Sequence, residues 1–458
     1  MKDLLDRYSN FRRIDADGRH WTTSTQRIVV EYGAGARAAE LLKPWVHSGL
    51  VLLLQDRNTA RVAGDEVAHS LRSAGAHLEV ITLQPDEGHE DLRCDDPTID
   101  DFERIVRAHG PAHVIAVGAG TLNDIAKMAC HRVSVPYSCV ATAPSMNGYT
   151  SAIAAILSAG VKTTQPCTPP VAVLADPLVM AAAPYRMIAS GIGDLYSKPV
   201  SNADWRLSHR LLGTEHSAIV MEIVEAGSAL LDGVAPRLPA RDPDAVAALT
   251  TALMLSGLAM QAAGSSATAS GGEHLVSHYI DMTSVAFDLP HDFHGCQVAC
   301  GTIATSALYE HVRSMDPSTI DIDGLVARWP DLAQVEAIVH ERFGILAPSV
   351  LPYARQNHVD ATELRRRLTL LVEQWDSIME DCGHTLRPTT ELQAELDSAD
   401  CPTQFPQLPV DRERAYAAFA WSRFIRARYT ILHLAAELGV MDSFARSFVD
   451  AQYDRAGS

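Results

Sequence analysis

The sequence predicts an α/β domain with a parallel sheet, followed by an all-helical domain. Over residues 1–185, short apolar runs of strand length alternate with helical patterns, which is typical of a parallel sheet covered on both faces. Over residues 186–458, strand signals disappear and helical periodicity dominates. We therefore expect two domains that meet near residue 185, just after Ala183 and Pro184.

The strands of the first domain are expected where the chain carries continuous apolar runs rich in β-branched residues. Such runs are typical of strands that are buried on both faces of a sheet. They fall at residues 27–31, 50–54, 78–83, 113–117 and 138–141, with helical patterns at 36–42, 63–74 and 99–109.

The second domain is expected to consist of helices joined by loops. Helical patterns cover residues 215–232, 243–263, 273–280, 296–312, 333–342, 362–379 and 412–439. Residues 383–410 contain four prolines, so we expect a long surface connection there with little more than a single helical turn.

Composition narrows the class of protein. The chain has 458 residues, of which 47% are hydrophobic and 21% charged, so it can bury a core and is not disordered as a whole. Its formal charge of −18 disfavours binding to nucleic acid or to anionic lipid. A small anionic substrate would need a locally positive pocket.

Two features bear on the compartment. The stretch 245–272 carries no charge, but it is rich in Ala, Ser, Thr and Gly, so we expect a buried core helix and not a membrane span. The eight cysteines form no C-x-x-C pair, and the N-terminus lacks the apolar segment of a signal peptide. We therefore expect reduced thiols and a cytoplasmic protein without membrane insertion.

Three polar loops indicate a nucleotide site at one edge of the sheet. The carboxyl ends of parallel strands form the usual ligand crevice, and a glycine turn before a helix can hold a phosphate. The loops are Gly118-Ala119-Gly120-Thr121, Asp56-Arg57-Asn58-Thr59 and Thr142-Ala143-Pro144-Ser145. The third glycine of G-x-G-x-x-G is replaced by Asn123, and ordinary turn chemistry remains an alternative for each loop.

Histidines and a carboxylate indicate a divalent metal site. His274 and His278 are four residues apart, so they share one face of a helix. His294 lies at the start of an apolar helix, and Asp194 follows a glycine-rich segment. One carboxylate and two imidazoles suit a catalytic metal that polarises a substrate oxygen. A structural role for such a histidine pair remains the alternative.

Eight motifs in order give the chain a resemblance to the bacterial sn-glycerol-1-phosphate dehydrogenase family, within the superfamily of iron-containing alcohol dehydrogenases and dehydroquinate synthases. The resemblance spans about residues 25–440. The motifs are VGAGTLNDIAK (117–127), TAPSMNGYTS (142–151), GVKTTQP (160–166), ADPLVMAAAPYRMIASGIGD (175–194), ADWRLS (203–208), SGGEHLVSHYIDM (270–282), HGCQV (294–298) and IRARYTILHLAAELG (425–439).

The resemblance implies a Rossmann-like N-terminal domain, a helical C-terminal domain and a dehydroquinate synthase-like fold with the active site in the cleft between them. It places a metal, expected to be zinc with iron or nickel as alternatives, on Asp194, His274 and His294. It assigns NAD or NADP to Asp56, Asn58, Thr59, Gly118, Gly120, Thr121, Asp124, Thr142 and Ser145. It gives four candidate catalytic residues, with His278 beside the metal and Lys198, Asn147 and Lys162 beside the substrate, although the two lysines could also simply face solvent.

Three departures from the family pattern fall near the implied substrate. Asn147 stands where the family usually has aspartate, and an amide cannot accept a proton as a carboxylate can. Ala267 replaces an arginine suited to phosphate recognition, and Cys296 replaces a glutamate after His294. Our hypothesis is that fold and metal chemistry persist on an altered substrate; tolerated substitution is the alternative.

The sequence therefore predicts a metal- and NAD(P)-dependent dehydrogenase that interconverts a small ketone and a secondary alcohol. The expected substrate is a polyol phosphate, such as dihydroxyacetone phosphate and sn-glycerol 1-phosphate, or a related compound. Asp56 favours NAD slightly, through a ribose hydroxyl. A synthase-like cyclase or lyase that uses NAD without net redox is the alternative, and a catalytically silent homologue is a further one. We expect a homodimer or higher homo-oligomer.

Overall fold

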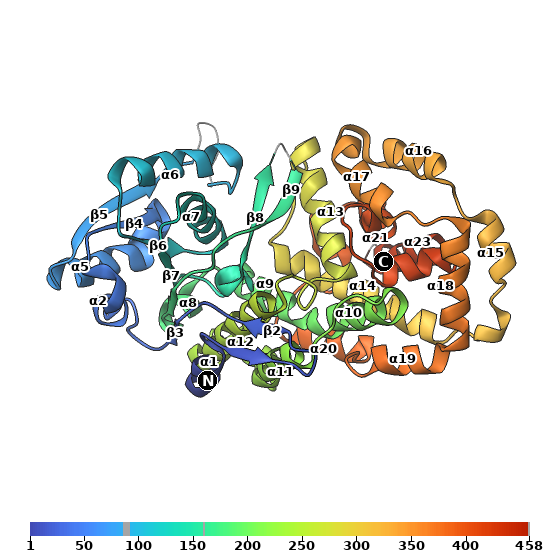
Figure 1. Cartoon of the computed structure of the whole chain (residues 1–458), viewed down its shortest axis with the longest axis horizontal. Helices are drawn as coiled ribbons and strands as arrows, with labels where there is room; N and C mark the ends of the chain where they lie inside the picture. The colour runs from blue at the N-terminus through green and yellow to red at the C-terminus, as the bar shows by residue number, and fades with distance from the viewer. Residues whose placement is uncertain (86–91, 159–160, 457–458) are drawn as a thin grey trace. The chain divides into compact units, whose positions relative to one another are not determined.

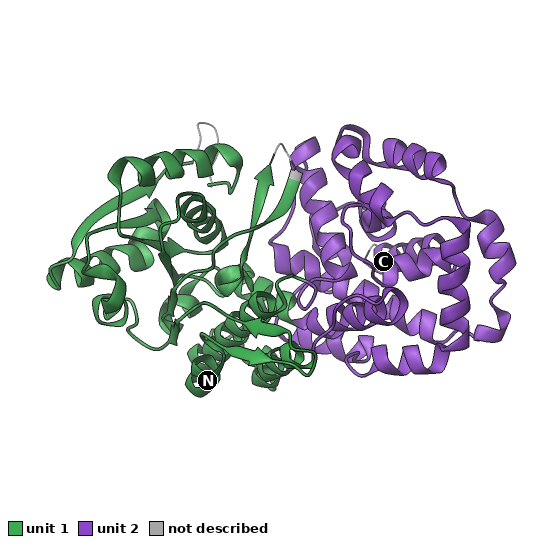
Figure 2. Cartoon of the chain, in the orientation of Figure 1, with its two compact units in different colours: residues 1–195, 218–266 green, residues 196–217, 267–458 purple. Residues whose placement is uncertain are grey.

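The structure is a computed structural model that describes residues 1–85, 92–158 and 161–456 (Figure 1). The chain forms two compact units (Figure 2). The first contains residues 1–195 and 218–266, and the second contains residues 196–217 and 267–458. The chain therefore leaves the first unit, returns to it for one segment and then completes the second.

A six-stranded parallel sheet forms the centre of the first unit; five of its strands lie at the predicted apolar runs, and the sixth, at residues 172–175, was not predicted. The strand order is β3-β10-β7-β6-β4-β5. These strands are β3 (Arg27–Val30), β4 (Leu50–Asp56), β5 (His77–Leu83), β6 (His113–Gly118), β7 (Tyr137–Ala141) and β10 (Ala172–Ala175). All residues of β6 and β7 are buried, as expected for strands covered on both faces.

Helices cover this sheet and complete the unit. They are α1 (Lys2–Tyr8), α2 (Ala38–Leu41), α3 (Lys43–Val46), α4 (Arg57–Thr59), the π-helix η1 (Ala60–Gly64), α5 (Asp65–Ser73), α6 (Asp96–His109), α7 (Gly120–Val133), α8 (Pro177–Ala182), α9 (Tyr185–Tyr196), α11 (Ala218–Ser228) and α12 (Pro243–Ala263). One apolar cluster joins Val51 and Leu53 of β4 to Val67 and Leu71 of α5. Successive side chains of each strand point to opposite faces of the sheet, so side chains on both faces can pack against the covering helices. The sheet is therefore the core of the unit.

Two antiparallel hairpins accompany the parallel sheet. They are β1 (Arg12–Ile14) with β2 (His20–Thr22), and β8 (Ile153–Ser158) with β9 (Val161–Pro166). Neither hairpin is among the strands that the sequence predicts.

Helix α12 is the uncharged stretch that could be mistaken for a membrane span. By length and composition it is the single helix of the described ranges that could cross a membrane, yet 94% of its apolar window is buried within the protein. It packs against α8, α11 and the short turn η2 (Gly148–Thr150). Its place is therefore that of a core helix, as the sequence predicts.

The second unit is helical throughout the part that the structure describes, which confirms the all-helical expectation. Its helices are α10 (Lys198–Leu212), α13 (Gly272–Phe287), α14 (His294–Arg313), α15 (Ile322–Arg328), α16 (Leu332–Phe343), α17 (Ala347–Asn357), α18 (Ala361–Glu373), α19 (Trp375–Gly383), α20 (Thr389–Ser398), α21 (Arg412–Trp421), α22 (Ile431–Glu437) and α23 (Met441–Ala456). A 3₁₀ turn, η8 (Ser422–Phe424), follows α21.

The structure corrects the long surface connection expected at 383–410. This segment contains the ten-residue helix α20, in which Leu392 and Leu396 are buried. The carboxylate of Glu310 on α14 accepts a hydrogen bond from Thr389 N–H at 2.7 Å and so satisfies a backbone donor at the start of α20. The prolines flank this helix and do not interrupt it, which is why their number misled the prediction.

The bounds of the two compact units also differ from the single domain boundary that the sequence predicts near residue 185. The first unit extends through α9 to Leu195 and includes residues 218–266. The reason is packing, because α12 contacts α1, β2 and β3 as well as α8. Two other predicted helices are divided in the structure: residues 362–379 fall on α18 and α19, and residues 412–439 fall on α21, η8 and α22.

Candidate active site

The strand order has a switch point between β4 and β6. From β4 the chain continues to β5 on one side, and β6 pairs with β4 on the other side. Ligands of open parallel sheets bind at such a switch point, outside the carboxyl ends of the strands. Asp56 ends β4, and Gly118 ends β6. The sheet therefore brings two of the three predicted polar loops to the place where a nucleotide would bind.

The glycine turn after β6 leads directly into α7. A Cβ atom at Gly118 would lie 2.7 Å from Cβ of Leu122, so the turn needs glycine for packing alone. At Gly120, the first residue of α7, an added Cβ would meet only the side chain of Met146, at 3.4 Å. The first N–H groups of a helix have no acceptor within it, and they favour an anion. Thr121 is exposed in this first turn.

Asp56, Asn58 and Thr59 form a local cap at the end of β4. Oδ1 of Asp56 accepts hydrogen bonds from the N–H groups of Asn58 at 2.8 Å and Thr59 at 2.7 Å. The hydroxyl of Thr59 accepts a bond from the Asp56 N–H at 2.9 Å, which completes a capping box. The structure therefore gives this loop a folding role beside the ribose contact predicted for it.

Asp124 has its own structural partners on α7. Its Oδ2 accepts a hydrogen bond from Ala155 N–H of β8 at 3.0 Å. Its Oδ1 accepts one from the Asn123 amide at 3.0 Å and lies 3.3 Å from Nζ of Lys127. Asp124 therefore joins α7 to the β8–β9 hairpin, so its place in the glycine motif has a packing explanation.

The loop after β7 is held beneath helix α9. Thr142 N–H donates to the carbonyl of Gly118 at 3.3 Å, which ties the loop to the glycine turn. The carbonyl of Ser145 accepts a hydrogen bond from the Ser190 hydroxyl at 2.9 Å. Both Thr142 and Ser145 are buried. The three predicted cofactor loops thus follow three adjacent strands, in the order β7, β6 and β4.

Gly191 allows α9 to approach this loop closely. A Cβ atom built at Gly191 would lie 1.8 Å from the carbonyl oxygen of Pro144, which is far inside van der Waals contact. We therefore expect Gly191→Ala to lower the free energy of unfolding of the first unit by about 3 kcal/mol, since an overpacked core must shift its backbone. Urea unfolding followed by circular dichroism measures this change.

Gly227 provides the matched control for Gly191. It also lies in a helix of the first unit, but there a Cβ atom would find its nearest neighbours at an ordinary 3.5 Å. Alanine is the better helix former, so Gly227→Ala should keep or raise stability by up to about 1 kcal/mol. Equal unfolding midpoints for the two variants would show that α9 can move away from Pro144 without cost.

Asp194 is buried at the end of α9 and is held by Asn147. Its Oδ2 accepts the Asn147 backbone N–H at 2.9 Å, and its Oδ1 accepts the Asn147 side-chain amide at 3.1 Å. An aspartate at position 147 would place a second carboxylate against the first. Asn147 is therefore a hydrogen-bond donor to the predicted metal ligand, which is a role that the family's usual aspartate could not fill while ionised.

In the second unit, three histidines meet. The ring centres of His274 and His294 are 5.2 Å apart, and those of His278 and His294 are 5.4 Å apart with the rings nearly parallel. His274 and His278 come from consecutive turns of α13, whereas His294 begins α14. Tertiary packing therefore brings together the two predicted metal-binding histidines and the third histidine, His278, which was predicted to lie beside the metal.

Neighbouring side chains orient two of these imidazoles. Nδ1 of His274 donates to Oε1 of the fully buried Glu273 at 2.8 Å. Nδ1 of His294 lies 3.0 Å from the hydroxyl of Ser277. A partner on one ring nitrogen fixes the tautomer and directs the other nitrogen elsewhere, as around metal-binding histidines. Glu273 and Ser277 were not predicted as site residues, although their helical spacing from His274 and His278 marks them as neighbours.

Asp204 of α10 connects the two histidine helices. Its Oδ2 accepts the N–H of Gly272, at the start of α13, at 2.7 Å. Its Oδ1 accepts the Tyr309 hydroxyl of α14 at 2.6 Å and the Ile431 N–H of α22 at 2.7 Å. Burial, together with the nearby Glu273, raises the pKa of Asp204 to about 7. Asp204 lies in the motif ADWRLS (203–208), but the sequence assigned it no role in the site.

The two predicted lysines lie in different units and surroundings. Lys198 is buried on α10, where Nζ donates to the Ser197 hydroxyl at 3.0 Å and to the Ala269 carbonyl at 3.2 Å. A solvent-facing role for Lys198 is therefore wrong. The hydrogen bond to Ala269 places the Lys198 ammonium beside the segment in which Ala267 replaces an arginine. Lys162 is half-buried on β9, opposite Leu157 of β8.

The donor set suits a divalent metal, although its members belong to separate units. Asp194 lies in the first unit, while His274 and His294 lie in the second. Within the described ranges, no group of three or more His, Cys, Asp and Glu side chains is already gathered as a metal site. One carboxylate and two imidazoles are nonetheless the ligand types of a catalytic zinc or iron centre, and the Glu273 carboxylate fixes the tautomer of His274.

Comparison with known proteins gives matches along most of the chain. A family model described as iron-containing alcohol dehydrogenase matches residues 29–184. The glycerol-1-phosphate dehydrogenase of Bacillus subtilis, named for NAD(P)+, is 32% identical over 292 residues, covering 63% of this chain and 73% of the relative. The protein of the same name from Geobacillus thermodenitrificans is 30% identical over 373 residues, covering 77% and 91%.

Solved structures agree in fold. A probable glycerol dehydrogenase from Sinorhizobium meliloti superposes with a TM-score of 0.59 at 17% identity, over 92% of this chain and 97% of that one. The NADH-dependent butanol dehydrogenase A of Thermotoga maritima gives 0.56 at 14% identity, over 92% and 97%. At these identities the likeness concerns the fold alone.

Proposed function

The chain belongs to the glycerol-1-phosphate dehydrogenase family of iron-containing alcohol dehydrogenases, and from this premise we propose that it interconverts dihydroxyacetone phosphate and sn-glycerol 1-phosphate. As a member, it is an NAD(P)-dependent oxidoreductase. The observation that carries the proposal is the pairing of a glycine turn at the sheet's switch point with a histidine cluster in the helical unit.

We propose that the cofactor pyrophosphate binds at Gly118, Gly120 and Thr121. The start of α7 supplies backbone N–H donors there, and only the Met146 side chain would meet a Cβ atom at Gly120. Thr142 and Ser145 follow β7 beside this turn, where they would border the nicotinamide half. Asp124 then supports the turn through β8 and does not need to touch the cofactor.

Asp56 offers a direct test of the adenosine side. We expect Asp56→Asn to raise KM for NADH by roughly tenfold and to lower KM for NADPH, since a carboxylate pairs with a ribose hydroxyl but repels a 2′-phosphate. Asparagine still caps the following turn, so the fold is retained. Steady-state kinetics with both cofactors measures the ratio. Equal KM changes for both cofactors would limit Asp56 to its capping role.

We propose that Asp194, His274 and His294 hold the metal, and that the metal is zinc. A divalent ion bound there would act as a Lewis acid on a substrate oxygen. Glu273 and Ser277 orient the two imidazoles, while Asn147 holds the carboxylate. Because Asn147 cannot accept a proton, His278, whose ring stacks on His294, is the group of the cluster that we assign to proton movement.

The substrate phosphate needs positive charge within an acidic protein. We propose that Lys198, held beside Ala269, and Lys162 provide it in place of the arginine absent at position 267. Such a substitution exchanges a bidentate guanidinium for point charges, which hold a phosphate with less geometric restriction. A relaxed preference for related polyol phosphates follows from this exchange.

The decisive assay follows reduced nicotinamide with dihydroxyacetone phosphate, and then runs the reverse reaction with each enantiomer of glycerol phosphate. We expect one equivalent of NAD(P)H consumed per ketone reduced, and reverse activity with sn-glycerol 1-phosphate only. Turnover without net change in NAD(P)H would instead indicate a synthase-like reaction. Activity on unphosphorylated dihydroxyacetone alone would overturn the phosphate assignment and support an altered substrate.

Two further assignments remain proposals. The eight cysteines form no C-x-x-C pair and are spread through a long chain, which supports a reducing compartment, and we propose the cytoplasm. We also propose a homodimer or higher homo-oligomer, which light scattering after size-exclusion chromatography would establish.

A further inference from the structure

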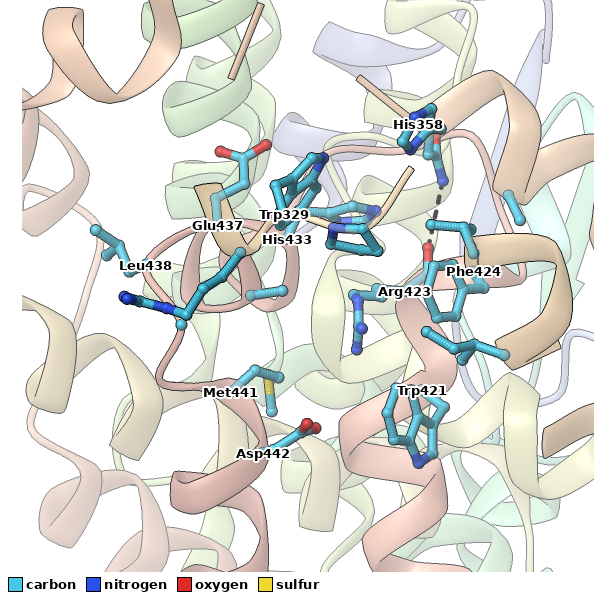
Figure 3. A pocket seen from close by; sticks show the side chains of 18 of the residues that line it. Trp329, His358, Trp421, Arg423, Phe424, His433, Glu437, Leu438, Met441 and Asp442 are labelled. Atoms are coloured by element: carbon cyan, nitrogen blue, oxygen red, sulfur yellow. Dashed lines mark hydrogen bonds between the residues drawn. The ribbon is translucent and has the colours of Figure 1, made fainter. Parts of the chain in front are cut away.

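A cavity of about 360 Å³ lies inside the helical unit (Figure 3). Its walls come from α15, α16, α17, α22, α23 and the turn η8. None of the residues assigned above to cofactor, metal or substrate lines it. Cavities of roughly 300–1,000 Å³ are typical of small-molecule sites. The cavity thus has the size of a ligand site whose residues are separate from the dehydrogenase site.

Arg423 places a half-buried cation on this cavity. Its guanidinium lies 4.4 Å from the ring centre of Phe424 and 5.0 Å from that of Trp421, and it donates to the Ala420 carbonyl. Across the described part of the chain, no carboxylate forms an ion pair with it. Burial lowers the pKa of Arg423 to about 10. A desolvated cation without a counter-charge is costly, and an anion would offset that cost.

Other partly buried arginines of this unit show what a compensated cation looks like. Arg367 lies 2.8 Å from Glu363 and 3.0 Å from Glu437, and Arg206 lies 2.8 Å from Asp381. Guanidinium groups have five N–H donors, so these partners are the usual way of satisfying them. Arg414 of the same unit has no ion pair in the described ranges either, but its guanidinium donates to two carbonyl and two hydroxyl oxygens. Within the same ranges, Arg423 has neither a carboxylate partner nor such a set of acceptors, and donates to the Ala420 carbonyl.

The acidic and basic neighbours on the cavity wall do not replace an anion for Arg423. Glu437 is already engaged by Arg367 and by the Tyr429 hydroxyl at 2.6 Å. Asp442 is exposed in the first turn of α23, where its charge acts on Arg423 without reaching ion-pair distance. Burial lowers the pKa of His433 to about 3, so this imidazole is neutral. Arg328, exposed at the end of α15, adds a second positive charge to the wall.

Aromatic side chains form the apolar part of the wall, as Figure 3 shows around Arg423. The rings of Trp421 and Phe424 are stacked, with centres 6.4 Å apart and planes 8° from parallel. The indole N–H of Trp329 donates to the Val359 carbonyl at 2.9 Å, so Trp329 has no further donor for a ligand. These side chains therefore provide flat apolar surfaces, which favour an aromatic ligand.

We propose that this cavity is a second binding site, and that its ligand is a small aromatic carboxylate. The carboxylate pairs with Arg423, and the ring lies against Trp329, Trp421 and Phe424. The proposal does not depend on the substrate of the dehydrogenase site, because the two sites share no residues.

Calorimetric titration of the purified full chain with 1-naphthoate and with the neutral 1-naphthalenemethanol tests the proposal. We expect the acid to bind at least roughly tenfold more tightly than the alcohol, since a charge-assisted pair contributes about 1.5–3 kcal/mol. Arg423→Gln should reduce the affinity for the acid to that for the alcohol. Arg104→Gln, at an exposed arginine of the first unit, changes net charge equally and should have no effect.

Even if Arg423→Gln does not fold, the affinities of the unsubstituted protein for 1-naphthoate and for 1-naphthalenemethanol test the proposal. Equal affinity for both ligands, or no binding of either, would overturn the proposal. Loss of naphthoate binding in the presence of saturating NADH would overturn it as well, because the acid would then occupy the nucleotide site.

Discussion

Replacing His274 by alanine is expected to lower kcat/KM for dihydroxyacetone phosphate by roughly a thousandfold or more. A bound metal supplies several kcal/mol of charge stabilisation, and about 4 kcal/mol corresponds to this loss. His274 is buried, with Nδ1 fixed on Glu273, so its ring is already oriented as a ligand before metal binds. The metal content of the dialysed protein, measured by mass spectrometry, should fall in parallel.

Two further variants distinguish the loss of a metal ligand from unfolding of the protein. Glu273→Gln keeps the size of the side chain but weakens the hold on Nδ1, and metal affinity should fall by roughly 10- to 100-fold. His340→Ala, at an exposed histidine of α16, removes an imidazole from the same unit and should change neither metal content nor rate. If His274→Ala retained full metal content, the proposed ligand set would be wrong.

Much of the fold could be predicted because its signals are local. The strands β4 to β7 are continuous apolar runs, and each run is long enough to identify without its neighbours. The β8–β9 hairpin was missed because Lys162 and the threonines of VKTTQP give no apolar run. Helix α20 was missed because Leu392 and Leu396 are the only apolar side chains buried in it, and prolines flank it.

The candidate site also has one part that local sequence patterns predict and another that depends on contacts between distant residues. His274 and His278 could be paired from their spacing, since one turn of α13 separates them. Their approach to His294 depends on how α13 packs on α14, which no local pattern contains. Asp204 shows the limit most clearly, because its partners Gly272, Tyr309 and Ile431 are 68, 105 and 227 residues away.

Asp204→Ala is the second change with a large expected effect. It would leave the N–H groups of Gly272 and Ile431 and the Tyr309 hydroxyl without their acceptor inside the unit. We expect a loss of about 3–5 kcal/mol in the free energy of unfolding, because unsatisfied buried donors cost about 1–3 kcal/mol each and the core relaxes partly. Metal affinity should fall as well, since the start of α13 is no longer fixed.

The same residue gives a pH dependence with a definite sign. Burial raises the pKa of Asp204 from 3.8 to about 7, so the folded chain binds this proton more tightly than the unfolded chain. The resulting stabilisation is complete below pH 3.8 and is lost as the pH rises to about 7. The unfolding midpoint of the metal-free protein should therefore decline over this window and then change no further on account of Asp204.

The variant Asp204→Asn removes the titratable carboxyl group but keeps the size and shape of the side chain. The variant cannot titrate, so its unfolding midpoint should lack the decline attributed to Asp204 between about pH 4 and pH 7. Asp411→Asn is the matched control, because Asp411 caps α21 at an exposed position, where asparagine caps equally well. A decline of the same size in Asp204→Asn would assign the titration to another group.

A role of Asp204 in positioning the start of α13 predicts one more result. Metal affinity should fall in Asp204→Asn and in Tyr309→Phe, but not in Asp411→Asn. A loss of stability without that fall would make Asp204 a structural residue only.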